Sequence, residues 1–135
     1  MSRVQLALNV ADVDAAVEFY SKLFATPVAK RRPGYANFVV ADPPLKLVLI
    51  ESADGARLNH LGVEVSSLDD VRAATSRLAG EGLPTMIQDG VECCYAVQDK
   101  VWVSDPDGAR WEVYTVLADS GTLAATKKEG ATSCC

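Results

Sequence analysis

The chain has 135 residues, of which 49% are hydrophobic and 23% charged, with a net charge of -5 and a pI near 4.8. This length suits one domain, and the hydrophobic content is sufficient for a buried core. The acidic balance argues against a nucleic-acid-binding protein, which needs a basic stripe. The nearest candidate, Lys30 to Arg32, is short, ends at Pro33-Gly34 and has the pattern of a solvated loop.

No apolar stretch approaches the ~20 residues that a membrane-spanning helix needs. The N-terminus begins with a strand pattern rather than with a signal peptide. We therefore expect a cytoplasmic protein with no membrane or nucleic-acid partner, in which the cysteine thiols stay reduced.

The first half of the chain has the pattern of a strand, a helix and further strands. Apolar and other residues alternate from Val4 to Val10, which is the period of a half-buried strand. Asp12 can cap a helix whose apolar stripe extends from Val13 to Phe24. Strand-like runs follow at residues 35–41 and 45–51.

The second half repeats this order at a constant offset, which places His60 on Gln5 and Leu78 on Leu23. Ser67 opens the second helical stripe, and Gly80 closes it. The repetition predicts an internal duplication of a strand–helix–strands module. Three more strands are expected at residues 85–88, 96–103 and 110–117.

These patterns predict an α+β domain over residues 1–117, built from two βαβββ modules at about 1–52 and 57–117. From Ala118 onward the chain is rich in Gly, Thr, Ser and Lys and has little to pack. Residues 118–135 are therefore expected to form a flexible tail. This tail ends in Cys134 and Cys135.

Gln5, His60 and Glu112 are the candidate metal ligands. Successive side chains in a strand point to opposite faces, and the face opposite Gln5 and His60 is wholly apolar. Both residues therefore point to the concave side of the sheet, where the duplication would bring them together. Glu112 from the last strand could complete the set, whereas Val48 at its equivalent position is apolar. Three ligands would leave coordination positions open for dioxygen or substrate.

Cys93 and Cys94 are adjacent, so a trans peptide holds their Cα atoms ~3.8 Å apart, below the ~4.4–6.8 Å of a usual disulfide. They are better suited to chelating one soft atom together. The alternative is that both are small buried hydrophobic residues. Their setting between Asp89-Gly90 and Tyr95 resembles a loop and favours accessibility. For the nearby Asp99 and Lys100, solvation at the surface is the simpler expectation. Four aromatic residues could line a pocket or belong to the core: Tyr35, Tyr95, Trp102 and Trp111.

The duplicated module together with "SDPDGARWEVY" resembles the vicinal oxygen chelate superfamily of glyoxalases, bleomycin-binding proteins and extradiol dioxygenases. The runs "RVQLALNV", "LNHLGVEV" and "VECCYAVQDKVWV" are similar to the bacterial group of carbon-arsenic lyases and cadmium-induced proteins. The resemblance implies a half-barrel around a metal site, with Gln5, His60 and Glu112 as iron ligands. It implies that Cys93 and Cys94 bind trivalent organoarsenicals.

The reaction implied by the resemblance is Fe(II)- and dioxygen-dependent cleavage of the carbon-arsenic bond in methylarsenite or reduced aromatic arsenicals, with release of arsenite. The family pattern also implies a homodimer. Two alternatives stay open: a thiol protein that binds cadmium or arsenite, and a glyoxalase-like metalloenzyme. A protein that binds metal through thiols alone would not need Gln5, His60 and Glu112, and Val48 argues against a fourth protein ligand.

Overall fold

The computed structural model describes residues 2–53 and 57–119. It divides into two compact units, Arg3–Leu61 and the described residues from Gly62 onward together with Ser2. The first unit holds β1 (Arg3–Val10), α1 (Val13–Leu23), β2 (Lys30–Arg32), β3 (Tyr35–Val40), β4 (Leu45–Glu51) and the first residues of β5 (Leu58–Glu64). The second holds the end of β5, α2 (Leu68–Gly80), β6 (Met86–Cys93), β7 (Ala96–Ser104) and β8 (Arg110–Asp119).

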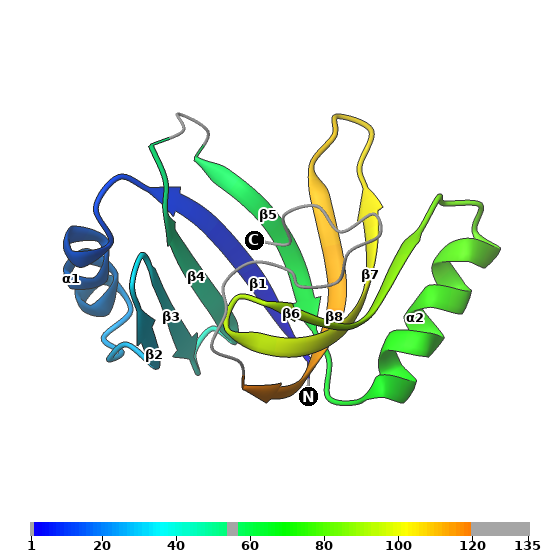
Figure 1. Ribbon diagram of the computed structural model, residues 1–135, viewed down its shortest axis with the longest axis horizontal. Helices are drawn as coiled ribbons and strands as arrows, with labels where there is room; N and C mark the ends of the chain where they lie inside the picture. The colour runs from blue at the N-terminus through cyan, green and yellow to red at the C-terminus, as the bar shows by residue number, and fades with distance from the viewer. Residues whose placement is uncertain (1, 54–56, 120–135) are drawn as a thin grey trace. The chain divides into compact units, whose positions relative to one another are not determined.

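In the first unit, β1 pairs in parallel with β4, and β4 and β2 pair antiparallel with β3. The helix α1 covers one face of these strands (Figure 1). It begins where predicted because the Asp12 carboxylate accepts hydrogen bonds from the backbone N–H groups of Asp14 and Ala15. The apolar core lies between α1 and this face and includes Leu6, Leu8, Val13, Val17, Ala36, Phe38, Val40, Leu47 and Leu49.

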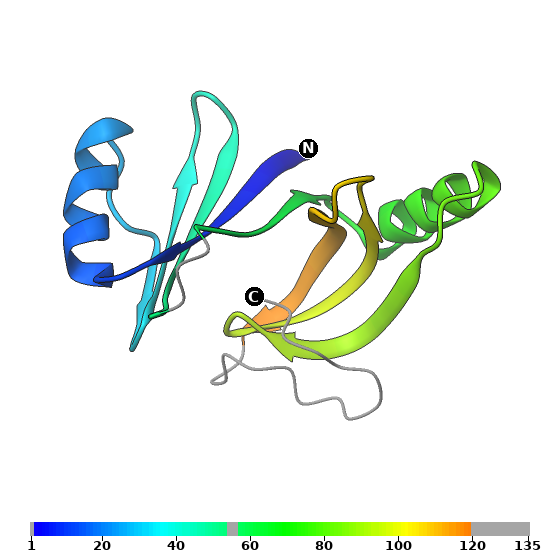
Figure 2. The same ribbon diagram turned by 90° about the horizontal axis from the view of Figure 1, so that it is seen from above.

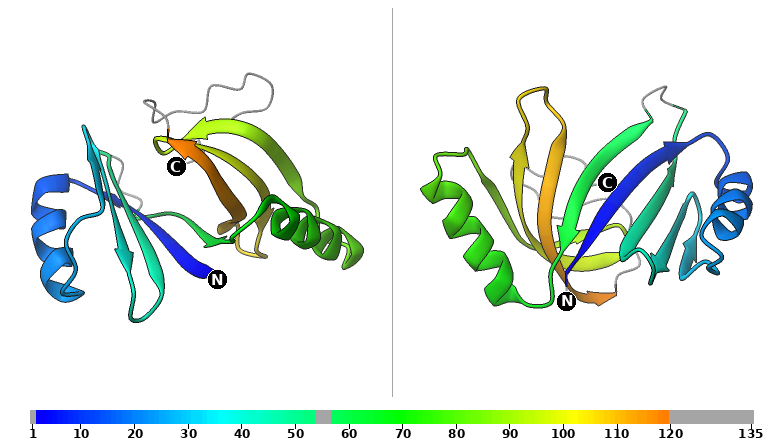
Figure 3. Two further views of the ribbon diagram at one scale, coloured as in Figure 1. Left: turned by 90° about the horizontal axis from the view of Figure 1, so that it is seen from below. Right: turned by 180° about the vertical axis from the view of Figure 1, so that it is seen from behind.

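In the second unit, β7 lies between β6 and β8 and pairs antiparallel with both. The helix α2 contacts β7 and β8 (Figure 2). Its first turn is capped by the hydroxyl of Ser67, as predicted, and its residues Val71 and Ala74 are buried. The β6, β7 and β8 strands are seen from two further sides in Figure 3.

The structure corrects three element predictions. Residues Lys30–Arg32 form the short edge strand β2 rather than a loop, because their backbone pairs with β3. The strand β6 continues to Cys93 instead of ending at Gln88, because a register shift between Gln88 and Val91 lets the ladder resume. The strand β8 extends to Asp119, two residues into the expected tail; the rest of that tail, with Cys134 and Cys135, lies outside the described residues.

The α+β class is confirmed, and the order strand, helix, three strands occurs twice along the chain. A common origin of the two modules, and the domain bounds, stay predictions. Neither described helix is long and apolar enough to cross a membrane.

Candidate functional site

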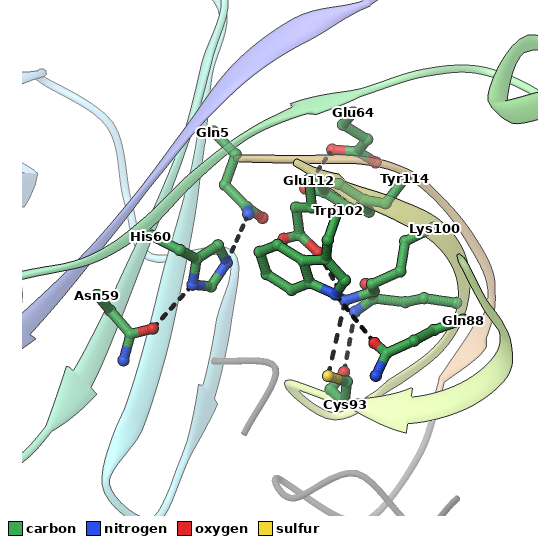
Figure 4. A network of polar contacts seen from close by, with 11 residues as sticks. Gln5, Asn59, His60, Glu64, Gln88, Cys93, Lys100, Trp102, Glu112 and Tyr114 are labelled. Atoms are coloured by element: carbon green, nitrogen blue, oxygen red, sulfur yellow. Dashed lines mark hydrogen bonds and ion pairs between the residues drawn. The ribbon is translucent and has the colours of Figure 1, made fainter. Parts of the chain in front are cut away.

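Gln5 and His60 meet within the first unit, on the side of its strands that faces away from α1. Their side chains are only 4% and 1% exposed, and the Gln5 amide nitrogen lies 3.2 Å from Nε2 of His60 (Figure 4). The two residues that the repeat places at equivalent positions are therefore in direct contact.

A chain of hydrogen bonds fixes the tautomer of His60. Its Nδ1 lies 2.8 Å from the amide oxygen of Asn59, which can only accept, so Nδ1 carries the proton. Asn59 in turn donates to Asn9 Oδ1 at 3.0 Å. The Nε2 lone pair of His60 therefore points toward Gln5, in the tautomer that a metal ligand requires. Sequence reasoning missed Asn59; the only available signal was its position directly before His60.

The donor atoms of this pair fit a divalent metal of borderline softness. A neutral imidazole nitrogen and an amide oxygen suit iron or manganese, whereas an all-thiolate set would favour zinc or cadmium. Gln5 now presents its NH₂ group to His60. To bind a metal, the amide would have to turn its oxygen toward it. His60 Nε2 would then lose its contact with the Gln5 NH₂ group and bind the metal instead.

Glu112 lies in the second unit and is paired with a buried lysine. The Lys100 Nζ atom is 2.6 Å from Glu112 Oε1, with side chains 0% and 3% exposed (Figure 4). The same ammonium lies 5.3 Å from the centre of the Trp102 ring and 5.8 Å from that of Tyr114, within cation–π range. The expectation of a solvated Lys100 is wrong, because its side chain is fully buried in β7, between β6 and β8, and is paired with Glu112.

Asp99 is buried as well, and its surface expectation is also wrong. Its carboxylate accepts a 2.6 Å hydrogen bond from the backbone N–H of Gly90. Gly90 has a positive φ of 60° in the irregular stretch of β6, a conformation that glycine adopts without strain. Asp99 therefore stabilises the irregularity that brings β6 to the cysteines.

Cys93 is fully buried at the end of β6, and its sulfur lies 3.6 Å from Lys100 Nζ (Figure 4). The expected loop-like accessibility is wrong for Cys93 because the strand extends further than its sequence pattern indicates. The expectation of reduced thiols differs from this structure, in which both Cys93 and Cys94 are disulfide-bonded. Binding a soft ligand through both sulfurs would therefore require their reduction.

The turn after Cys93 is strained. Cys94 and Tyr95 have φ values of 52° and 60°, and they join the paired residues Cys93 and Ala96. Such two-residue hairpin turns favour Asn-Gly, because an L side chain at positive φ costs about 1–3 kcal/mol. Non-glycine residues held at positive φ cluster at functional sites, so the turn is a candidate binding element.

The aromatic residues divide between site and core. Trp102 shares a face with Lys100 and donates from Nε1 to Gln88 Oε1 at 3.0 Å. Tyr95 is buried in the hairpin turn, whereas Tyr35 is buried in the first unit and bonded to Asn37. Trp111 is only partly buried. Within residues 2–53 and 57–119, no three His, Cys, Asp or Glu side chains gather to hold a metal, and the predicted trio contains only two residues of those types.

A family model covering residues 3–113 matches the chain, described as the Glyoxalase/Bleomycin resistance protein/Dioxygenase superfamily. The chain belongs to this superfamily. Among superfamily structures, the Mn(II)-bound glyoxalase of Novosphingobium aromaticivorans matches with a TM-score of 0.63 at 20% identity, over 97% of this chain and 45% of that one. This similarity supports the predicted vicinal oxygen chelate fold.

Two relatives are much closer in sequence. The cadmium-induced protein CadI of Mycobacterium tuberculosis is 60% identical over 98% of this chain and 88% of its own length. The trivalent organoarsenical cleaving enzyme of Thermomonospora curvata is 58% identical over 100% of this chain and 89% of its own. The group predicted from sequence is therefore confirmed, and the enzymes within it support an enzymatic role for this superfamily member.

Replacing Lys100 by methionine is expected to lower the free energy of unfolding by about 3–5 kcal/mol, because a buried carboxylate loses its partner. Urea denaturation measures this loss. Lys22→Met is the matched control: its pair with Glu18 spans 3.8 Å with side chains 76% and 75% exposed, and should contribute less than about 1 kcal/mol. Equal losses in the two variants would contradict a structural role for the Lys100 ion pair.

Proposed function

We propose that this chain cleaves the carbon-arsenic bond of trivalent organoarsenicals, methylarsenite and reduced aromatic arsenicals, and releases arsenite in the cytoplasm, giving organoarsenical resistance. The observation that carries the proposal is the buried Lys100 ammonium, which contacts both the Glu112 carboxylate and the Cys93 sulfur. A hard oxygen ligand and a soft sulfur ligand thereby contact the same ammonium within one compact unit. The name of the Thermomonospora relative supports the same substrate class.

In this proposal Gln5, His60 and Glu112 hold Fe(II), which when bound would supply the activation of dioxygen, the co-substrate. His60 offers its Nε2 lone pair, already directed by Asn59. Glu112 offers the negative charge that offsets the charge of the cation. Three protein ligands would leave coordination positions available for dioxygen.

Reduced Cys93 and Cys94 bind the arsenic atom. Trivalent arsenic is soft and prefers thiolates, and two sulfurs on adjacent residues fix its position and therefore that of its carbon substituent. Lys100 offsets the negative charge of a Cys93 thiolate at 3.6 Å. Trp102, on the same face of β7, offers an aromatic surface to a methyl or phenyl substituent.

One assay tests the function. Reduced protein is loaded with Fe(II) under anaerobic conditions, mixed with methylarsenite and exposed to air, and arsenic species are then separated. We expect arsenite to form only when iron, air and protein are all present. Unchanged methylarsenite in the complete mixture would refute the proposal.

The second candidate is a binding protein for cadmium or arsenite, in keeping with the mycobacterial relative, whose name describes it as induced by cadmium. It predicts stoichiometric Cd²⁺ or arsenite binding by reduced protein and no arsenite release in the assay above. The tautomer-fixing chain on His60 argues against it, because thiol binding does not need a directed imidazole. A glyoxalase-like activity is the third candidate. In the first module Val48 occupies the position equivalent to Glu112, and this buried apolar residue argues against a fourth protein ligand.

The proposal includes a homodimer, as the family pattern implies and as the exposed apolar side chains Phe19 and Leu23 of α1 would allow. Light scattering at working concentration is expected to give twice the mass of one chain. A monomer with intact activity would contradict this part.

A further inference from the structure

Gln98 carries a buried acceptor atom to which no described residue donates a hydrogen bond. The residue is 4% exposed, and its Nε2 donates to the carbonyl oxygen of Cys93 at 2.9 Å. Its Oε1 is buried and has no hydrogen-bond partner in the part of the chain that the structure describes. Because buried polar atoms in native proteins are nearly all bonded, such an atom calls for a partner that the described residues do not supply, such as a bound ligand.

The position of Gln98 indicates which partner this is. It pairs with Val91 of β6, so it lies on the same face as Cys93, which pairs with Ala96, and as Lys100 two residues along β7. A register shift against β8 occurs between Val97 and Gln98. Such irregularities redirect side chains and are common beside active sites. The free acceptor therefore belongs to the group of residues around the Cys93 sulfur.

We propose that Gln98 Oε1 accepts a hydrogen bond from the hydroxyl group that the arsenic atom still carries after its first bond to sulfur. The inference rests on the proposed function and names the form of the substrate that the site selects, a hydroxylated trivalent arsenical. In water such a compound carries one carbon substituent and two hydroxyls on arsenic.

Once Cys93 and Cys94 are reduced from the disulfide-bonded state of this structure, the capture steps balance without a further oxidant or reductant. In the first step a sulfur–arsenic bond forms, one arsenic–oxygen bond breaks, and the thiol proton leaves with that hydroxyl as water. The remaining hydroxyl donates to Gln98 Oε1, which holds the singly bound arsenical in place while Gln98 Nε2 holds the Cys93 backbone. In the second step the other thiol displaces this hydroxyl in the same way and releases a second water.

The test compares two forms of one arsenical on reduced protein. Phenylarsine oxide hydrates to the dihydroxyl form, whereas the same compound saturated with a monothiol carries no hydroxyl on arsenic. Their association rates are measured by stopped-flow fluorescence without iron. For Gln98→Met we expect the ratio of the hydroxyl-form rate to the thiol-form rate to fall about tenfold from wild type, the contribution of one hydrogen bond.

The matched control is Gln88→Met, which removes another buried glutamine of this face, one that bonds Trp102 instead of Cys93. It should leave the rate ratio at the wild-type value. An unchanged ratio in Gln98→Met, or an equal fall in Gln88→Met, would overturn the inference. If Gln98→Met fails to fold, Gln98→Glu replaces it, because it keeps an acceptor at this position. This variant should keep the preference for the hydroxyl form, and loss of that preference would also overturn the inference.

The rate ratio does not depend on turnover, so the two proposals fail separately. A tenfold fall of the rate ratio in Gln98→Met, with no arsenite release by the wild-type enzyme, would support the Gln98 contact and refute carbon-arsenic cleavage. Arsenite release with an unchanged ratio would refute only the role of Gln98.

Discussion

Replacing His60 by alanine is expected to lower Fe(II) affinity by more than roughly 100-fold and to abolish arsenite release, since loss of an outer-shell partner alone costs 10–100-fold. Glu112→Ala should do the same, because the bound cation loses its negatively charged ligand. Gln5→Ala should have a smaller effect, because a neutral amide is a poorer ligand. Iron content after anaerobic reconstitution and arsenite release are the two measurements.

Asn59→Ala provides a graded control for this prediction. It removes the acceptor of His60 Nδ1 without removing the imidazole, so Fe(II) affinity should fall by about 10–100-fold rather than vanish. Full iron occupancy and activity in Glu112→Ala would instead remove Glu112 from the metal site.

Changing either Cys93 or Cys94 to serine is expected to weaken binding of a trivalent arylarsenical by ~10²- to 10⁴-fold, because the second sulfur binds an already tethered atom. Arsenite release should be lost, while bound iron stays at the wild-type level, since the two sets of ligands share no residue. Stoichiometric titration of reduced protein with the arylarsenical and metal analysis of the same samples measure the two effects.

Removal of residues 120–135 is the control for the cysteine prediction, since it deletes Cys134 and Cys135. The cut follows Asp119 because that residue still pairs with Ala96 of β7. Catalysis should survive this deletion. Near-full turnover in Cys93→Ser or Cys94→Ser together with an inactive truncation would assign the arsenic to Cys134 and Cys135 instead.

Periodicity alone predicted the parts of the fold in which one side of an element is uniformly apolar. The strand β1 and the helix α1 are examples, since Leu6, Leu8 and Val13 all contribute to one core. The constant offset between modules then predicted that Gln5 and His60 occupy equivalent places, and they are in contact. Whether Glu112 joins them at one metal stays a prediction.

Lys100 shows what periodicity could not supply. Lysine is rarely buried, so the sequence favours a solvated side chain. Its burial depends on Glu112, twelve residues onward and in the neighbouring strand, where Glu112 pairs with Trp102 and Lys100 with Tyr114. That diagonal relation becomes visible only once the register of β7 and β8 is known. The contact of Gln98 with the Cys93 carbonyl oxygen likewise becomes visible only once the strand register is known.

The extra residue in β6 decides which side chains share a face. Between the turn and the irregularity, the odd-numbered residues Cys93 and Val91 lie on the same face as Lys100. On the other side of the irregularity, the even-numbered Gln88 lies on that face. A side chain at Gly90 that forced regular pairing at unchanged length would place Asp89 opposite Lys100 in place of Gln88, and Ile87 opposite Trp102 in place of Met86. Deleting one residue there would keep both Cys93 and Gln88 in place, so in this hairpin a shortening is expected to be less disruptive than a substitution.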